Sequence, residues 1–73
     1  MKVKMIFNLP EDDEDFKIAA NASRMNVTLY ELDQWLRSKT KYADDNLSKD
    51  KYDAYQECRD KLHELLRENN IEL

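Results

Sequence analysis

Residues 27–42 read VTLYELDQWLRSKTKY and contain the chain's single tryptophan together with its clearest helix start. Thr28 and Glu31 have the spacing of a capping box, in which each side chain bonds a backbone N–H that the first helical turn leaves unpaired. Val27 and Leu32 flank this turn as a hydrophobic staple would. The sequence therefore predicts that a helix starts at Thr28.

This predicted helix runs to about Thr40, and one of its sides is apolar. Residues three and four apart share a helix face, so a recurrence at these intervals predicts a buried stripe. The residues of the stripe are Leu29, Leu32, Trp35, Leu36 and Lys39. We therefore expect the core of the protein to form around Trp35.

The chain length and composition set limits on the class of protein. Seventy-three residues make one domain, 1–73, which buries roughly 60% of the surface that its unfolded chain exposes. The net charge of −4 argues against binding to nucleic acid through bulk charge. The sequence contains no glycine, which argues against the phosphate-cradling loops of nucleotide-binding folds. We therefore expect neither a cofactor nor a nucleotide site.

The cysteine content and hydropathy indicate a compartment. Cys58 is the single cysteine, so no disulfide can form within the chain, and a reducing compartment is expected. No apolar run is long enough to cross a bilayer, and no pattern of a signal peptide is present. We expect a cytoplasmic protein without a membrane interaction.

The first nine residues alternate between two sides, as in a half-buried strand. A strand needs a backbone partner, and the candidates are the tail at 71–73, a helix surface, or the same strand in a second copy of the chain. One side carries Val3, Met5, Phe7 and Leu9, and the other carries Lys2, Lys4, Ile6 and Asn8. A homodimer through this strand is therefore one of the expected arrangements.

Three helices are expected after the strand. Pro10 suits a first helical position, and the helix that it opens should run to about Arg24. Arg24–Asn26 is the expected turn into the helix capped by Thr28, and residues 42–47 are the expected loop. Ser48 then caps a third helix that reaches about Glu68. The predicted fold class is α+β and mostly α, with one short N-terminal strand followed by three helices in a small single domain.

The apolar faces of the outer helices and two acid–base pairs complete the predicted packing. The first helix should bury Phe16, Ala19, Ala20 and Ser23, broadened by Ile18, Ala22 and Met25. The third should bury Tyr52, Tyr55, Cys58, Leu62, Leu65 and Leu66, spaced as in a bundle seam. The pairs Asp33 with Arg37 and Glu57 with Lys61 are four apart, which favours exposed ion pairs along a helix.

No catalytic or metal site is expected. Cys58 and His63 are five residues apart on one helix and point about 140° away from each other, so they cannot form a nucleophile–base pair. We interpret Cys58 as a buried structural residue and His63 as solvent-facing. Asp44, Asn46, Ser48 and Asp50 alternate like the start of a calcium loop, but Lys49 replaces its turn glycine and Tyr55 its bidentate glutamate.

The five consecutive acidic residues at 11–15 are the candidate binding site. Its five carboxylates suit a first helical turn because negative charge there complements the helix dipole. They could also imitate phosphates and occupy the cationic groove of a protein that handles nucleic acid. Exposed tyrosines would add interface contacts. The expected partner-binding residues are Glu11, Asp12, Asp13, Glu14, Asp15, Tyr30 and Tyr42.

Four segments resemble small proteins of unknown function that tailed bacteriophages and prophages encode. They are FNLPED at 7–12, LDQWLRSK at 32–39, KY at 41–42 and RDKLHELLRENN at 59–70. The resemblance covers nearly the whole chain. It implies a phage accessory protein that acts in the cytoplasm of an infected bacterium.

The first forty residues also resemble ribbon-helix-helix repressors. Leu9, Pro10, Glu11 and Asp12 match the step from strand to helix in that family, and Asn26–Thr28 matches the opening of its second helix. The resemblance implies an intertwined dimer whose paired strands enter the major groove of DNA. Lys2, Lys4, Ile6 and Asn8 would face the bases.

Two functions are therefore expected from the sequence. The leading one is a non-catalytic phage accessory protein that binds, and plausibly inhibits, a host or phage protein with a basic groove, such as a defence nuclease. The alternative is a dimeric DNA-binding transcriptional regulator of the ribbon-helix-helix type. A third class, an assembly protein that uses the last helix as a seam, would depend on Leu62.

Overall fold

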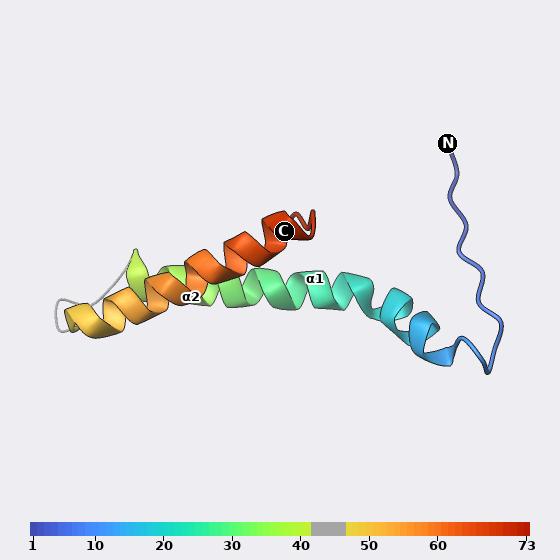
Figure 1. Cartoon of the computed structure of the whole chain (residues 1–73), viewed down its shortest axis with the longest axis horizontal. Coiled ribbons are helices and arrows are strands. Elements are labelled where there is room, and N and C mark those ends of the chain that lie inside the picture. Colours follow the sequence, from blue (N-terminus) through green and yellow to red (C-terminus); the bar gives the residue numbers. More distant parts are fainter. Residues whose placement is uncertain (42–46) are drawn as a thin grey trace.

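The computed structural model describes residues 1–41 and 47–73, which form a hairpin of two helices (Figure 1). The helix α1 spans Asp13–Thr40 and α2 spans Lys49–Glu68. At 1.5 Å per residue, α1 is about 42 Å long and α2 about 30 Å. Because α2 returns along α1 from the far end, it covers only the C-terminal part of α1, and the N-terminal part projects beyond it.

The predicted α+β class is wrong, because the described residues contain two helices and no strand. Residues 1–8 form an extended arm that leads into a turn before α1. A strand requires a neighbour for its backbone N–H and C=O groups, and the arm has none within the described chain. The tail at 71–73, one of the expected partners, lies after α2 and forms no strand. Alternation of side chains alone was therefore an insufficient signal.

The two predicted helices on either side of Arg24–Asn26 are one continuous helix, α1. Thr28 does not cap a helix, since its Oγ1 donates to the carbonyl oxygen of Arg24 at 2.8 Å, one turn earlier. Such back-bonding is the alternative use of a threonine within a helix. No glycine or proline lies near this point to break the helix. The capping-box pattern therefore occurs in a helix interior.

The start of α1 is held by a turn at residues 8–12. The N–H of Asp12 donates to the carbonyl of Asn8 at 2.8 Å, and the Asp12 carboxylate accepts from the N–H of Asn8 at 2.9 Å. The rings of Phe7 and Phe16 then pack edge to face with centroids 5.7 Å apart. The helix thus begins at Asp13, three residues after Pro10, which lies in the turn.

The ends of α2 are both capped. As predicted, Ser48 is the N-cap, and its side chain accepts from the N–H of Lys51 at 3.3 Å. At the other end Asn70 has a φ of 55°, and the N–H of Ile71 donates to the carbonyl of Leu66 at 2.9 Å. This is the Schellman arrangement, in which the left-handed position usually belongs to glycine and sometimes to asparagine. In a chain without glycine, asparagine fills it.

The core is small and is not centred on Trp35. Among the described residues, Leu36 and Leu66 are the buried hydrophobic side chains, while Trp35 is 50% exposed. The indole packs edge to face on Tyr55 with centroids 5.8 Å apart, and the Lys39 ammonium lies 5.4 Å from the centre of its ring. Trp35 therefore covers the margin of the helix contact rather than its centre.

Candidate protein-binding surface

The acidic turn, defined as residues 11–15, lies at the end of α1 that α2 does not reach (Figure 1). The nearest inter-helix ion pair is made by Asp33, about 27 Å further along the helix axis than Asp15. The acidic turn is therefore presented at one end of an elongated molecule, whose Cα extents are 54 × 27 × 17 Å.

Most carboxylates of the acidic turn are available to solvent. Glu11, Glu14 and Asp15 are exposed and form no ion pair with another described residue. Asp13 pairs with Lys17 at 2.9 Å, and both side chains are largely open to water. An exposed pair of this kind contributes only about 0–1 kcal/mol. The turn therefore keeps a concentrated negative charge.

The helix start explains why carboxylates are stable at this place. Three acidic residues occupy the first turn of α1, where the unpaired N–H groups and the helix dipole favour negative charge. Asp12 further binds a backbone N–H of the preceding turn. These local roles fix the backbone of the acidic turn, while the exposed carboxylates of Glu11, Glu14 and Asp15 can meet a cationic partner.

The predicted tyrosines are not part of the same patch. Tyr30 is 48% exposed, but it lies fifteen residues beyond Asp15, which is about 22 Å along the axis. Tyr42 lies outside the described residues. The structure thus gathers the five predicted carboxylates and separates Tyr30 from them.

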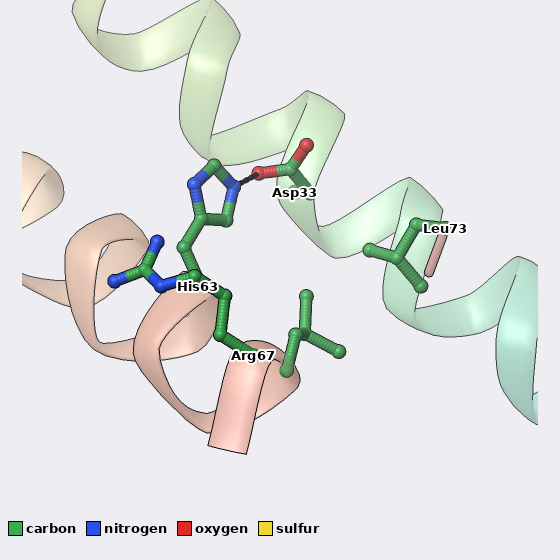
Figure 2. Close-up of a pocket in the computed structure, with 5 residues that line it drawn as sticks. Asp33, His63, Arg67 and Leu73 are labelled. Atoms are coloured by element: carbon green, nitrogen blue, oxygen red, sulfur yellow. Dashed lines mark hydrogen bonds and ion pairs between the residues drawn. The ribbon is translucent and has the colours of Figure 1, made fainter. Parts of the chain in front are cut away.

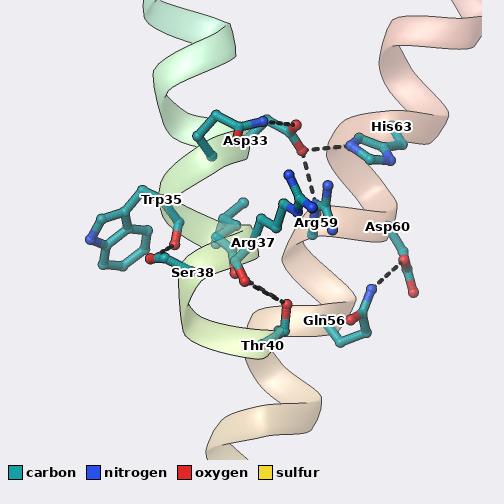
Figure 3. Close-up of polar contacts among 11 residues, drawn as sticks. Asp33, Trp35, Arg37, Ser38, Thr40, Gln56, Arg59, Asp60 and His63 are labelled. Carbon is teal, nitrogen blue, oxygen red and sulfur yellow. Dashed lines mark hydrogen bonds and ion pairs between the residues drawn. The ribbon is translucent and has the colours of Figure 1, made fainter. Parts of the chain in front are cut away.

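A second polar cluster joins the two helices, and the sequence interpretation missed it. Asp33 is 7% exposed, and its Oδ1 accepts a hydrogen bond from Nε of Arg59 at 3.0 Å (Figure 3). The same oxygen lies 2.6 Å from Nε2 of His63. We call these three residues the Asp33 cluster.

Several predicted contacts of α1 and α2 are wrong. Asp33 binds α2 rather than pairing with Arg37, and His63 faces α1 instead of solvent. Cys58 is exposed, not buried. Lys61 pairs with Glu64 at 3.1 Å instead of with Glu57.

The electrostatics of the Asp33 cluster favour an ionised carboxylate. Burial of Asp33 would by itself raise its pKa, because a charged carboxylate loses hydration there. The hydrogen bonds from Arg59 and His63, together with the positive charge of both groups, outweigh burial and lower the pKa of Asp33. The carboxylate is therefore an internal counter-ion between the helices.

An open pocket of about 270 Å³ adjoins the Asp33 cluster (Figure 2). It is lined by Asp33, His63, Leu66, Arg67 and Leu73. The lining includes no hydroxyl or thiol that could act as a covalent nucleophile. Since the Asp33 carboxylate is already engaged by α2, the pocket has the character of a packing defect at the helix contact.

The sequence positions of Asp33, Arg59 and His63 contain a signal for this cluster. Arg59 and His63 are four apart, so they share one face of α2, and Asp33 lies three before the buried Leu36 on α1. Pairing opposite charges between two antiparallel helices, rather than within each helix, predicts the contacts of Asp33 with Arg59 and His63.

The described residues contain neither a group of metal-binding side chains nor a membrane-spanning helix. Within 1–41 and 47–73, no three His, Cys, Asp or Glu side chains are grouped so as to hold a metal ion. Asp44 and Asn46 of the calcium-like pattern lie outside the described residues, while Ser48 serves as the cap of α2. Neither α1 nor α2, within the part of the chain that the structure describes, has the length and apolar character needed to cross a membrane.

Comparisons of the chain with known protein families, characterised proteins and solved structures gave no match.

Proposed function

We propose that the chain is a non-catalytic accessory protein that binds a basic surface of another protein through the acidic turn. The observation that carries this proposal is the projection of that turn, at the end of α1 beyond α2, with Glu11, Glu14 and Asp15 exposed and unpaired among the described residues. A projecting cluster of one charge attracts a surface of the opposite charge and speeds the encounter.

We propose the class of partner from the number of consecutive negative charges in the acidic turn. Five consecutive carboxylates resemble a short run of phosphates, and a groove that binds nucleic acid draws much of its affinity from such charge. From the resemblance to small tailed-phage proteins that the sequence suggests, we propose a host or phage partner of this kind in the bacterial cytoplasm, such as a defence nuclease. Occupation of the groove would inhibit the nuclease by competing with DNA.

A non-catalytic role is supported by the chemistry of the chain. The most strongly held carboxylate, Asp33, is used to join α1 to α2. The single cysteine, Cys58, is exposed and lies on a different side of α2 from His63. No described pair of nucleophile and base emerges from these residues.

The test is a triple charge reversal in the acidic turn, with a matched control. The variant carries Glu11→Lys, Glu14→Lys and Asp15→Lys, the three carboxylates of the acidic turn that are exposed and form no ion pair among the described residues. The control carries Asp50→Lys, Asp53→Lys and Glu57→Lys, three exposed carboxylates in the first half of α2. Both changes alter the net charge by the same amount, so nonspecific charge effects cancel.

The wild type, the reversal variant and the control each serve as bait in lysate of infected bacteria. Captured proteins are identified by mass spectrometry. We expect the wild type and the control to retain a nucleic-acid-handling protein that the reversal variant loses, with retention falling as salt rises. Purified partner should then lose DNA binding as the wild type is added. Equal capture by the reversal variant would contradict the proposal, provided that circular dichroism shows unchanged helix content.

A further inference from the structure

The isolated chain exposes much more surface than a compact protein of its size. Its accessible surface is 6611 Å², whereas a compact monomer of 8.8 kDa would expose about 4,800 Å². Its Cα radius of gyration is 17.4 Å, against about 11 Å for a compact chain of this length. The excess of about 1,800 Å² is roughly twice what each partner buries in a standard protein interface. The arm and the N-terminal part of α1 both project from the helical hairpin (Figure 1).

The exposed part of α1 carries the seam of a coiled coil. Its apolar residues alternate at intervals of four and three, the spacing at which two helices interlock side chains. They are Ile18, Ala22, Met25, Leu29, Leu32 and Leu36, which we call the α1 seam. The chain's own α2 covers Leu36, which is 5% exposed, and leaves Ile18 58%, Met25 49% and Leu32 45% exposed.

We propose that a second copy of the chain covers the exposed side of the α1 seam, which Ile18, Met25 and Leu32 form, with the two α1 helices antiparallel and a two-fold axis near Met25. The surface excess of the whole chain, about 1,800 Å², is larger than the roughly 800 Å² that each partner buries in a standard interface. In a two-fold dimer each copy presents the same patch, so the seam supplies its own complement. This proposal does not depend on the proposed function.

The residues that flank the α1 seam are compatible with a second copy of the same chain. They are Ala19, Asn21, Asn26 and Thr28, all uncharged. Like charges that face each other across a dimer interface would repel, and none occurs beside this part of the seam. The small Ala19 and Ala22 side chains also allow the two backbones to come close.

The charge at the two ends of α1 sets the orientation. Its first turn is acidic and its last turn carries Arg37 and Lys39. Parallel helices would place two acidic turns together, whereas antiparallel helices centred on Met25 place Asp13 of one copy near Arg37 of the other. Exposed pairs of this kind contribute about 0–1 kcal/mol each. They therefore select the orientation while the carboxylates stay at the surface, one acidic turn at each end of the dimer.

The first test is the mass of the full chain by sedimentation equilibrium at about 100 µM, where a dimer with a Kd near 1 µM is mostly formed. We expect a mass twice the 8.8 kDa of the chain. Met25→Glu places two carboxylates at the axis and should return the mass to that of one chain. The matched control is Val27→Glu, a residue 52% exposed on the other side of the same helix, which should stay dimeric.

A monomeric wild type at this concentration would overturn the proposal. So would equal dissociation by Val27→Glu and Met25→Glu. Circular dichroism on both variants separates loss of the dimer from loss of the fold, because both changes place a charge at an already exposed site.

The second test distinguishes the two orientations in a Cys58→Ser background. Residues 18 and 32 lie equally far from Met25, so an antiparallel dimer brings Ile18→Cys of one chain against Leu32→Cys of the other. In this arrangement residue 18 of one chain lies about 21 Å along the helix axis from residue 18 of the other chain. This distance is too long for a disulfide. We expect a cross-linked dimer when the two variants are mixed and mild oxidant is added. Cross-linking of Ile18→Cys to itself would overturn the antiparallel arrangement.

Discussion

The carboxylate of Asp33 on α1 lies 2.6 Å from Nε2 of His63 on α2, and the guanidinium of Arg59 is 3.0 Å from the same oxygen. With Leu36 and Leu66 as the buried hydrophobic side chains of the described residues, this polar contact supplies much of the specificity of the hairpin. It fixes which residues of the two helices lie opposite each other.

Replacement of Asp33 by alanine should lower the free energy of unfolding by about 1–3 kcal/mol. The change removes the shared acceptor and leaves Arg59, which is largely buried, without its counter-ion. Urea unfolding followed by circular dichroism measures the loss. The control is Asp53→Ala on the exposed side of α2, which should change stability by less than about 0.5 kcal/mol. Equal losses in the two variants would contradict a role of Asp33 in joining the helices.

Stability should fall in acid because of the same carboxylate. Its pKa in the folded chain is lowered, since hydrogen bonds and charge from Arg59 and His63 outweigh the effect of burial. The unfolded value is about 3.9, so the stabilisation is present above that pH and is lost as the pH falls below it through the lowered folded pKa. Urea unfolding of the wild type and Asp33→Asn between pH 2 and pH 6 should show their difference shrinking at the acid end. A difference independent of pH would contradict this assignment.

Two adjacent leucines of α2 should respond unequally to truncation. Leu66 is 8% exposed and Leu65 is 45% exposed. Leu66→Ala leaves a cavity in the helix contact and should cost about 2–3 kcal/mol. Leu65→Ala, the matched control, should cost about 1 kcal/mol or less because its side chain is already half open to water. Thermal unfolding of both variants checks the order, and a larger loss at Leu65 would place the helix contact elsewhere.

Two hydroxyl residues distinguish a real helix cap from the interior of a helix. Ser48 caps α2, so Ser48→Ala should lose about 1 kcal/mol of stability. Thr28 lies within α1, where alanine is the better helix former, so Thr28→Ala should leave stability unchanged or raise it by up to about 0.5 kcal/mol. Circular dichroism during thermal unfolding measures both. A loss of about 1 kcal/mol at Thr28 would mean that α1 is broken there.

The sequence predicts the elements with strong local signals. The cap at Ser48, the end of α2 near Glu68 and the end of α1 at Thr40 agree with the structure. Each depends on hydrogen bonds or charges within a few residues, which local patterns describe well. The predicted start of the first helix at Pro10 is wrong by three residues, because Pro10 lies in the turn and α1 begins at Asp13.

The features that need distant contacts were predicted poorly. A strand at residues 1–9 would need a partner strand, and side-chain alternation says nothing about one. The apolar stripe around Trp35 predicts a core centred on this residue, but the helix crossing instead buries Leu36 and leaves the indole at the edge. The Asp33 cluster joins residues 26 and 30 positions apart, which periodicity within one helix cannot reveal.

The unequal lengths of α1 and α2 imply an uneven resistance to local opening along one helix. Backbone amides of α1 opposite α2 are protected by the helix contact, so they should exchange with deuterium slowly, near the rate set by global unfolding. Amides between Asp13 and Met25 have no neighbouring helix in a single chain and should exchange far faster. Slow exchange there at high protein concentration would itself report that a second molecule had covered them.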